Sequence, residues 1–376
     1  MRIAILTQPL RYNFGGILQN YALQTVLRRM GHEVVTLDPA RYHCKWWWQY
    51  LIFIFRHIIT RYIRRNRDVT VLTEWLHDKE TKTLGTNTFK FIDYYIQRKE
   101  YRNLRQEIKG SDYDAYIVGS DQTWRYRYNR CRILDMFLDF TKGWKVKRIA
   151  YAASFGTNEW EGDTVTTKIC REAIKAFDLI TVRESSGIDI CKNVFNVEAH
   201  HVLDPTLLLN KEDYMKLEKR TKNLDTKDGE LYLYILDENE ENKKLANDIA
   251  SSKGMKSFTY HSNLADWQHQ HTLGEHMQSP VELWLSGFNQ AKVVLTDSFH
   301  ACVFSIIFRK QFYLYGNTDR GMARYNSLFN MLGINNRMVK TIEDVKNIHD
   351  INYNIVYDKL RSLQQKSTDF LNGSLI

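Results

Sequence analysis

A short apolar run that ends in a polar turn and then opens a helix constrains the fold of this chain most. Residues 292–296 are rich in β-branched side chains, which is typical of a buried parallel strand. Asp297 and Ser298 follow as good N-cap residues, and the apolar positions from Phe299 onward predict a buried helix. In an open α/β sheet, ligands bind at such a junction, at the carboxyl end of a strand. His300 falls in the first turn of this helix and would lie beside a ligand, although an ordinary buried histidine in a capped helix explains these residues equally well.

The same alternation of strands and helices recurs along the whole chain and predicts an α/β protein with parallel sheets. Strands are expected at residues 2–7, 33–37, 114–118, 147–153, 179–182, 231–236, 256–259, 292–296 and 311–315. A chain of 376 residues is long enough for two such domains. Pro205 marks the switch between them, because proline continues neither a strand nor a helix easily. We expect domains over residues 1–203 and 204–345, and a final helix within 346–376 that packs back on the first domain.

Small or polar side chains follow other predicted strands at the same sheet edge. Asn13-Phe14-Gly15-Gly16 opens the first helix, and Gly119-Ser120-Asp121-Gln122 follows the strand at 114–118. Arg183 ends the strand at 179–182, where a guanidinium can meet a carboxylate or a phosphate. A tight turn explains the glycine pair at least as well, and from the residues alone a surface pair with Glu184 explains Arg183 better than a ligand contact does.

A further helix is expected to begin within residues 316–324. It carries Arg320 and Arg324 near its start. These two side chains are either solvated helix charges or, if they lie beside His300, parts of an anion clamp.

Residues 41–67 interrupt the strand–helix pattern. They contain seven Lys or Arg and no acid, together with Trp46-Trp47-Trp48 and an apolar run at 51–55. That run is too short for a bilayer span of about 20 residues. The segment is either an interfacial amphipathic helix that meets acidic lipid or a helical insertion packed on the first domain. The formal net charge of +9 also favours an anionic partner, whether a phosphate-bearing substrate, nucleic acid or acidic lipid.

The cysteines and the start of the chain predict a cytoplasmic protein. Five cysteines form no C-x-x-C pair and are expected to be reduced thiols. Met1 leads directly into an apolar strand, without a signal peptide. The histidines at 261, 269, 271 and 276 lack the spacing of a metal motif, and no metal is expected.

Six short motifs, in this order and spacing, resemble those of the polysaccharide pyruvyl transferase family. They are Asn13-Phe14-Gly15-Gly16-Ile17-Leu18-Gln19-Asn20, Gly119-Ser120-Asp121-Gln122-Thr123-Trp124, Tyr151-Ala152-Ala153-Ser154-Phe155-Gly156, Val182-Arg183-Glu184, Leu203-Asp204-Pro205-Thr206 and Thr296-Asp297-Ser298-Phe299-His300. The resemblance spans most of the chain. It implies two Rossmann-like domains that face each other across a cleft, similar to B-type glycosyltransferases. It also implies an enzyme that transfers an enolpyruvyl unit from phosphoenolpyruvate to a sugar and forms a cyclic pyruvate ketal.

The resemblance assigns roles to the residues at the sheet edges. A polyanionic donor needs fork-shaped cations and helix-start amides, and the proton transfers suit a histidine. We therefore expect His300 to act as acid or base, with no metal or cofactor. The donor-binding residues would be Arg183, Asp297, Ser298, Arg320 and Arg324. The acceptor-binding residues would be Asn13, Gly15, Gly16, Asn20, Asp121 and Gln122.

Two positions depart from the pattern of the family. Ala301 stands where we expect a glycine after the histidine. Ser298 stands where some members carry a phosphate-binding arginine, a role that Arg320 and Arg324 could fill.

The expected acceptor is a polysaccharide repeat carried on a membrane lipid, as in exopolysaccharide or capsule synthesis. Residues 46–67 would then hold the enzyme peripherally on the anionic inner face of the cell membrane, without a role for nucleic acid. Two alternatives remain open. The same fold would serve a glycosyltransferase with a nucleotide-sugar donor. A non-enzymatic basic scaffold for membrane or nucleic acid is supported by residues 41–67 alone.

Overall fold

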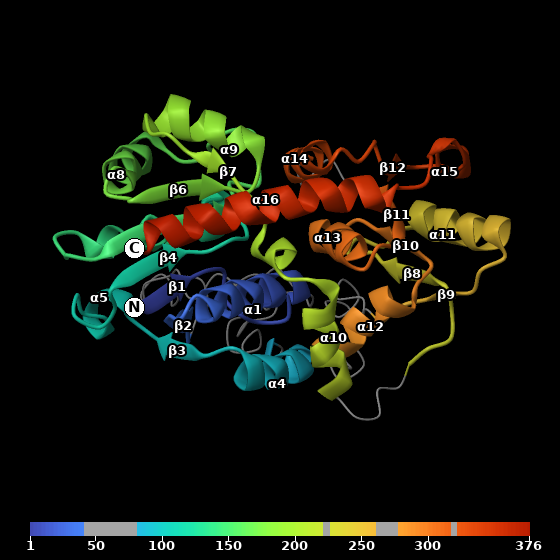
Figure 1. Cartoon of the computed structure of the whole chain (residues 1–376), viewed down its shortest axis with the longest axis horizontal. Coiled ribbons are helices and arrows are strands. Elements are labelled where there is room, and N and C mark those ends of the chain that lie inside the picture. Colours follow the sequence, from blue (N-terminus) through green and yellow to red (C-terminus); the bar gives the residue numbers. More distant parts are fainter. Residues whose placement is uncertain (41–80, 221–225, 261–276, 317–321) are drawn as a thin grey trace, which may run out of the picture.

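Two parallel β-sheets, one from each half of the chain, form the framework of the protein (Figure 1). The computed structural model describes residues 1–40, 81–220, 226–260, 277–316 and 322–376. Within these residues the first sheet has seven strands, in the order β3 (Arg98–Tyr101), β2 (Glu33–Pro39), β1 (Arg2–Leu6), β4 (Ala115–Val118), β5 (Lys147–Ala153), β6 (Leu179–Val182) and β7 (His200–His201).

The second sheet is smaller and is built in the same way. Its five described strands lie in the order β12 (Met338–Val339), β11 (Gln311–Tyr315), β10 (Val293–Thr296), β8 (Leu231–Tyr234) and β9 (Ser257–Phe258). Every strand pair described in the two sheets is parallel. The expectation of an α/β protein with parallel sheets is confirmed.

Helices connect the strands and cover the faces of both sheets. The helices of the first half are α1 (Phe14–Arg29), α4 (Thr86–Tyr95), α5 (Leu104–Glu107), α6 (Tyr126–Asn129), α7 (Ile133–Met136), η2 (Asp139–Thr141), α8 (Thr164–Ile174), α9 (Ser185–Ile190) and η3 (Cys191–Phe195). Those of the second half are η4 (Pro205–Leu208), α10 (Lys211–Arg220), α11 (Glu240–Lys253), α12 (Val281–Gln290), α13 (Phe299–Ile307), α14 (Ala323–Leu332), α15 (Ile342–Asn347) and α16 (Tyr353–Ser374).

The central strands β1, β4 and β5 of the first sheet are buried on both faces, to which successive side chains point in turn. In β1, Ile3 and Ile5 pack with α1 in one apolar cluster. Ala4 and Leu6 belong to a second cluster on the other face, together with residues of α7 and α8. This arrangement explains why the strands appear in the sequence as continuous apolar runs.

Some short elements differ from the sequence prediction. The edge strand β3, Arg98–Tyr101 beside β2, is not among the strands expected from the sequence. Its sequence, Arg-Lys-Glu-Tyr, carries no apolar alternation, because an edge strand needs few buried side chains. The two-residue strands β7 and β12 and the short helix α9 were not predicted either. The helix expected from residue 316 begins at Ala323, and residues 317–321 lie outside the described part.

The two sheets share one apolar cluster, in which Phe14 is the link. Phe14, the first residue of α1, stacks on Trp284 of α12 with ring centroids 5.4 Å apart and also approaches Tyr234 of β8 at 6.3 Å. The cluster continues from β1 and α1 into α12, β10 and α13. The start of α1 is therefore held by side chains of the second sheet.

Helix α16 crosses both halves of the molecule (Figure 1). Near its start, Tyr357 donates a hydrogen bond of 2.7 Å to the carbonyl of Ile307 at the end of α13. Near its end, Ser367 accepts a 3.1 Å hydrogen bond from the amide of Leu203, and Phe370 stacks on His200 of β7. The helix thus spans the outer side of both sheets and fixes one against the other.

Three of the described cysteines are free thiols, as predicted, and one is not. Cys170, Cys191 and Cys302 are buried free thiols. Burial raises the pKa of both Cys170 and Cys191 to about 12. Cys131 is disulfide-bonded, so the prediction that all five cysteines are reduced is wrong there.

None of the described helices combines the length and apolar character needed to cross a bilayer.

Candidate active site

The turn between β10 and α13 is held by hydrogen bonds to the neighbouring strand. Both carboxylate oxygens of Asp297 accept backbone N–H bonds, from Leu236 at 2.8 Å and Asp237 at 2.9 Å. Tyr325 of α14 donates a 2.8 Å bond to the carbonyl of Asp297. Asp297 therefore fixes the turn through these bonds. The hydroxyl of Ser298, the N-cap residue, makes no capping bond to α13.

His300 lies in the first turn of α13 and packs against the first turn of α1 from the other sheet. A Cβ placed on Gly15 would lie only 2.1 Å from His300 Nδ1, so the ring rests directly on the glycine backbone. On the other side of the ring, Nε2 lies 3.8 Å from Asp204 Oδ2. The His300 side chain is 9% exposed, and within the described residues Nε2 makes no hydrogen bond. The histidine is thus held between Gly15 and Asp204.

Asp204 is a buried carboxylate with several donors. Oδ2 accepts from Arg183 Nη1 at 2.7 Å and from the Ser120 hydroxyl at 2.8 Å. Oδ1 accepts from the amide and the hydroxyl of Thr206 at 3.0 and 2.6 Å. Burial by itself raises the pKa of Asp204, but hydrogen bonding and the charges of His300 and Arg183 lower it well below its usual range. The carboxylate therefore remains ionised.

Arg183 ends β6 and is almost completely buried beside Asp204. Besides the 2.7 Å contact, Nη2 lies 3.7 Å from Asp121 Oδ1, and the guanidinium lies over the Phe299 ring at 4.7 Å. Its side chain is 1% exposed. Burial lowers the pKa of Arg183, but the charges of Asp204 and Asp121 raise it above its ordinary value. Arg183 therefore remains charged and joins three parts of the chain.

Arg324 places a second guanidinium group over the ring of Phe299. It lies in the first turn of α14, over Phe299 at 5.4 Å, and is 7% exposed. Burial lowers the pKa of Arg324, and the nearby positive charge of Arg183 lowers it further. An anion bound beside the two guanidinium groups would offset this repulsion.

The predicted residues of the first domain lie around the start of α1. The Asn13 side chain caps α1 by accepting from the amide of Gly16 at 3.3 Å. Asp121, with a left-handed φ of 73°, places a carboxylate oxygen 3.4 Å from where a Cβ on Gly16 would be. Gln122 accepts from Arg125 Nη1 at 2.8 Å. The structure thus brings Asn13, Gly15, Gly16 and Asp121 near one another.

Asn20 does not join this group. Asn20 is completely buried between α1 and β2, where it accepts a 2.9 Å hydrogen bond from the Thr36 hydroxyl. Arg320 lies outside the described residues, as do residues 41–67.

Asp204, Ser120 and Glu184 were not among the predicted site residues. Glu184 is fully buried, and its Oε1 accepts from the Ser154 hydroxyl and from the amides of Phe155 and Gly156. It therefore shapes the turn after β5. All three residues stood in motifs visible in the sequence, but the sequence does not reveal which side chains they meet.

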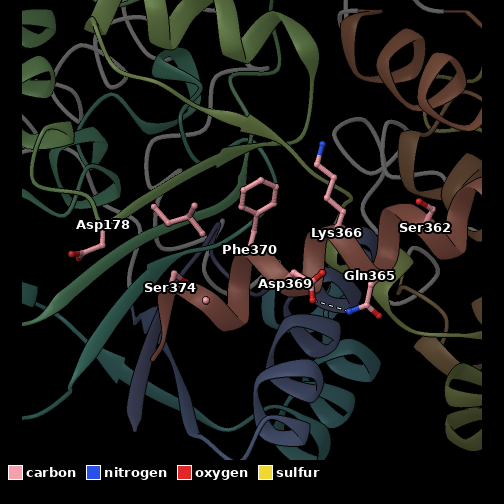
Figure 2. A pocket seen from close by; sticks show the side chains of 9 residues that line it. Asp178, Ser362, Gln365, Lys366, Asp369, Phe370 and Ser374 are labelled. Carbon is pink, nitrogen blue, oxygen red and sulfur yellow. Dashed lines mark hydrogen bonds between the residues drawn. The ribbon is translucent and has the colours of Figure 1, made fainter.

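A pocket of about 790 Å³ lies elsewhere, between α16 and the start of β6 (Figure 2). Lys366 and Phe370 project from α16 toward the strand, and Gln365 donates a 2.7 Å hydrogen bond to Asp369 along the helix. None of the residues around His300 lines this pocket. This pocket is therefore separate from the His300 cluster.

Comparison with known proteins gives one family and one fold. The family model described as polysaccharide pyruvyl transferase matches residues 13–319. Among solved structures, UGT89C1 of Arabidopsis thaliana complexed with UDP-L-rhamnose is 8% identical, with a TM-score of 0.52 and coverage of 99% of this chain and 98% of that one. MurG of Acinetobacter baumannii is 7% identical, with a TM-score of 0.43 and coverage of 99% and 94%. At these identities the likeness to UGT89C1 shows the fold alone. No curated protein matches the chain.

The contact between Gly15 and His300 predicts opposite outcomes for two neighbouring glycines. In Gly15→Ala the new Cβ would also lie 2.8 Å from the His300 Cβ, so the histidine must move, at the cost of about 1–3 kcal/mol typical of overpacking. In Gly16→Ala the nearest atom is 3.4 Å away, and stability should be unchanged or slightly higher. Denaturant unfolding of the two variants measures the difference. Equal stability would contradict the contact.

Proposed function

This chain belongs to the polysaccharide pyruvyl transferase family, and from that premise we propose that it transfers an enolpyruvyl unit from phosphoenolpyruvate to a sugar, forming a pyruvate ketal. The observation that carries the proposal is the position of His300. It lies at the start of a helix of the second sheet and touches the first turn of α1 from the first sheet. A proton-transfer group between two halves of a protein is suited to joining two substrates.

The chemistry requires proton transfers and the departure of phosphate. Two sugar hydroxyls each lose a proton as they bond to C2 of the enolpyruvyl unit. One proton is needed at C3, which becomes a methyl group, and the other leaves with the phosphate as hydrogen phosphate. A histidine can exchange protons near neutral pH, and His300 is the residue that we assign to this task.

The donor side would use the helix starts around Phe299. Arg324 and the amides at the start of α13 offer charge and hydrogen bonds to the carboxylate and phosphate of the donor. Ser298, whose hydroxyl makes no capping bond, is available there too. Asp297 would act by fixing the turn, and Arg320 remains a further donor-binding candidate from the sequence. We assign Arg183 a positioning role, because it is 1% exposed and paired with Asp204.

The acceptor side would be the start of α1 and the turn after β4. Asn13, Gly15, Gly16, Asp121 and Gln122 are the candidates there. Asn20, buried against Thr36, would act by holding α1 to β2.

The reaction itself is the first test. With phosphoenolpyruvate and a sugar-lipid acceptor, the protein should release phosphate and form a ketal whose methyl signal is visible by NMR. His300→Gln should lower turnover about 10²–10⁴-fold, the usual loss for a missing general acid or base. His32→Gln, a histidine beside the N-terminus, is the matched control and should retain activity. Consumption of a nucleotide sugar in place of phosphoenolpyruvate would establish the glycosyltransferase alternative instead.

Arg324 provides a test of the donor site. Arg324→Ala should weaken phosphoenolpyruvate binding more than tenfold, because a lost charge-assisted contact costs about 1.5–3 kcal/mol. Arg361→Ala removes an exposed arginine of α16 and should leave binding unchanged. Calorimetric titration with phosphoenolpyruvate measures both. Wild-type affinity in Arg324→Ala would remove this residue from the donor site.

We further propose that the acceptor is lipid-linked and that residues 46–67 hold the enzyme peripherally on the cytoplasmic face of the membrane. The support is the sequence alone, since these residues lie outside the described part. Binding to anionic vesicles should weaken with salt, because each basic side chain near an acidic surface contributes about 1 kcal/mol. Replacing Arg61, Arg64 and Arg65 with Glu should weaken it further, with activity on a water-soluble acceptor retained. Unchanged vesicle binding after this charge reversal would favour a packed insertion.

A further inference from the structure

A pocket of about 320 Å³ in the first half of the molecule has no part in the roles assigned so far. It lies where α4 leads into β3 (Figure 1). Phe89 and Asp93 line it from α4, one helical turn apart and therefore on the same face of that helix. Arg98 and Glu100 line it from β3, where alternate side chains share one face. Arg11 completes this set from the connection between β1 and α1.

The pocket lies at the same sheet edge as the start of α1, on which His300 rests. Arg11 follows β1 and Ala40 follows β2, and these two strands are parallel neighbours, so both residues stand at the carboxyl edge of the sheet. The connection that carries Arg11 continues to Gly15, the residue that touches His300. The Thr88 hydroxyl of α4 donates a 2.7 Å hydrogen bond to the Arg11 carbonyl and ties α4 to this connection. The pocket and His300 are thus joined through one short stretch of chain.

Ion pairs hold the charged side chains of the pocket in place. Arg98 Nη1 lies 3.0 Å from both Asp38 Oδ2 and Glu100 Oε1. Its Nη2 lies 2.7 Å from Asp93 Oδ1, and Arg11 Nη1 lies 3.6 Å from Asp38 Oδ2. The side chains of Asp93 and Glu100 are 63% and 54% exposed, so their carboxylates keep acceptor sites for a ligand. The pocket therefore offers donors and acceptors side by side in a fixed arrangement.

This lining suits a neutral saccharide better than a polyanion. The charged groups in and directly behind it are matched in number, with Arg11, Lys82 and Arg98 against Asp38, Asp93 and Glu100. A phosphate or carboxylate ligand would be repelled by Asp93, whereas a sugar hydroxyl can donate to Asp93 and accept from Arg11. The half-buried ring of Phe89 offers an apolar surface to the C–H face of a sugar ring. The volume lies within the range of about 300–1,000 Å³ that is typical of small-molecule sites.

We propose that this pocket binds a second sugar ring of the acceptor, next to the ring that receives the pyruvyl group. This inference rests on the proposed function and adds the class of acceptor, which is a neutral saccharide of at least two rings. Phe89 stacks on the second ring, and Asp93 and Glu100 accept hydrogen bonds from its hydroxyl groups. An acceptor of one ring occupies only the place at His300 and gains nothing from these contacts.

Ligand-observed NMR with the full-length protein tests the pocket in the absence of a donor. The probes are lactose, cellobiose and maltose, their component sugars galactose and glucose, and the acidic disaccharide cellobiouronic acid. At least one neutral disaccharide should bind at least about tenfold more tightly than its component sugars, because the second ring adds hydrogen bonds and apolar contact. Equal binding of the one-ring and two-ring probes, or tightest binding of the acidic probe, would overturn the proposal.

Phe89→Leu and Asp93→Ala then locate the bound disaccharide. Each should weaken its binding about three- to tenfold, through lost ring stacking in one variant and a lost hydrogen-bond acceptor in the other. Phe370→Leu and Asp369→Ala make the same changes in the pocket beside α16 and should leave binding unchanged. Wild-type affinity in both Phe89→Leu and Asp93→Ala would overturn the assignment of the sugar to this pocket.

The two variants are chosen to leave the fold intact. Leucine at position 89 keeps an apolar side chain on α4. When Asp93 is lost, Arg98 retains its contacts with Asp38 and Glu100. Each variant therefore tests the proposal by itself.

Steady-state kinetics separates this proposal from the proposed function. With phosphoenolpyruvate and the disaccharide that binds most tightly, Phe89→Leu should raise the KM of the disaccharide and leave kcat and the KM of phosphoenolpyruvate unchanged. A lower kcat with an unchanged disaccharide KM would contradict the role of Phe89 in holding a second ring. Absence of any turnover in the wild type would overturn the proposed function, whereas binding measured without a donor would still test the pocket.

Discussion

The buried ion pair between Arg183 and Asp204 is the interaction on which the site depends. Removing two charges from water is costly, and the pair is stable only where further hydrogen bonds satisfy its remaining atoms. Ser120 and Thr206 supply these bonds to the carboxylate, and Phe299 covers the guanidinium. The ion pair therefore joins the end of β6, the turn after β4, the start of η4 and the start of α13. Replacing one partner would disturb all four.

The residues of the candidate site come from two sheets that share one apolar cluster. Phe14 stacks on Trp284 across the junction, and α16 extends along both halves. As a result, the first turn of α1 and the first turn of α13 meet, and His300 rests on Gly15. Opening the two halves would separate His300 from Asp204 as well as from Gly15. Proton transfer at His300 would thus be coupled to the packing of the two sheets.

Position 298, directly after Asp297 at the start of α13, is a serine in this chain. The resemblance places an arginine there in some members, directly before the phenylalanine–histidine pair. In this chain the described guanidinium groups near Phe299 come instead from β6 and α14, at Arg183 and Arg324. On the proposed donor side, these two elements would supply the positive charge near Phe299. Arg324 is suited to this role because it lies in the first turn of its helix.

The sequence by itself determined the α/β alternation, the position of most strands and the family. Apolar β-branched runs such as residues 292–296 and the N-cap pair Asp297-Ser298 are local signals, and they predicted β10 and α13 correctly. The polar edge strand β3 carried no such signal, because few of its side chains are buried. Only the tertiary structure decided that Arg183 faces inward to Asp204 and that Asp204 faces His300. Those contacts join residues far apart in the chain, and the partner of a buried charge is set by how the two sheets pack.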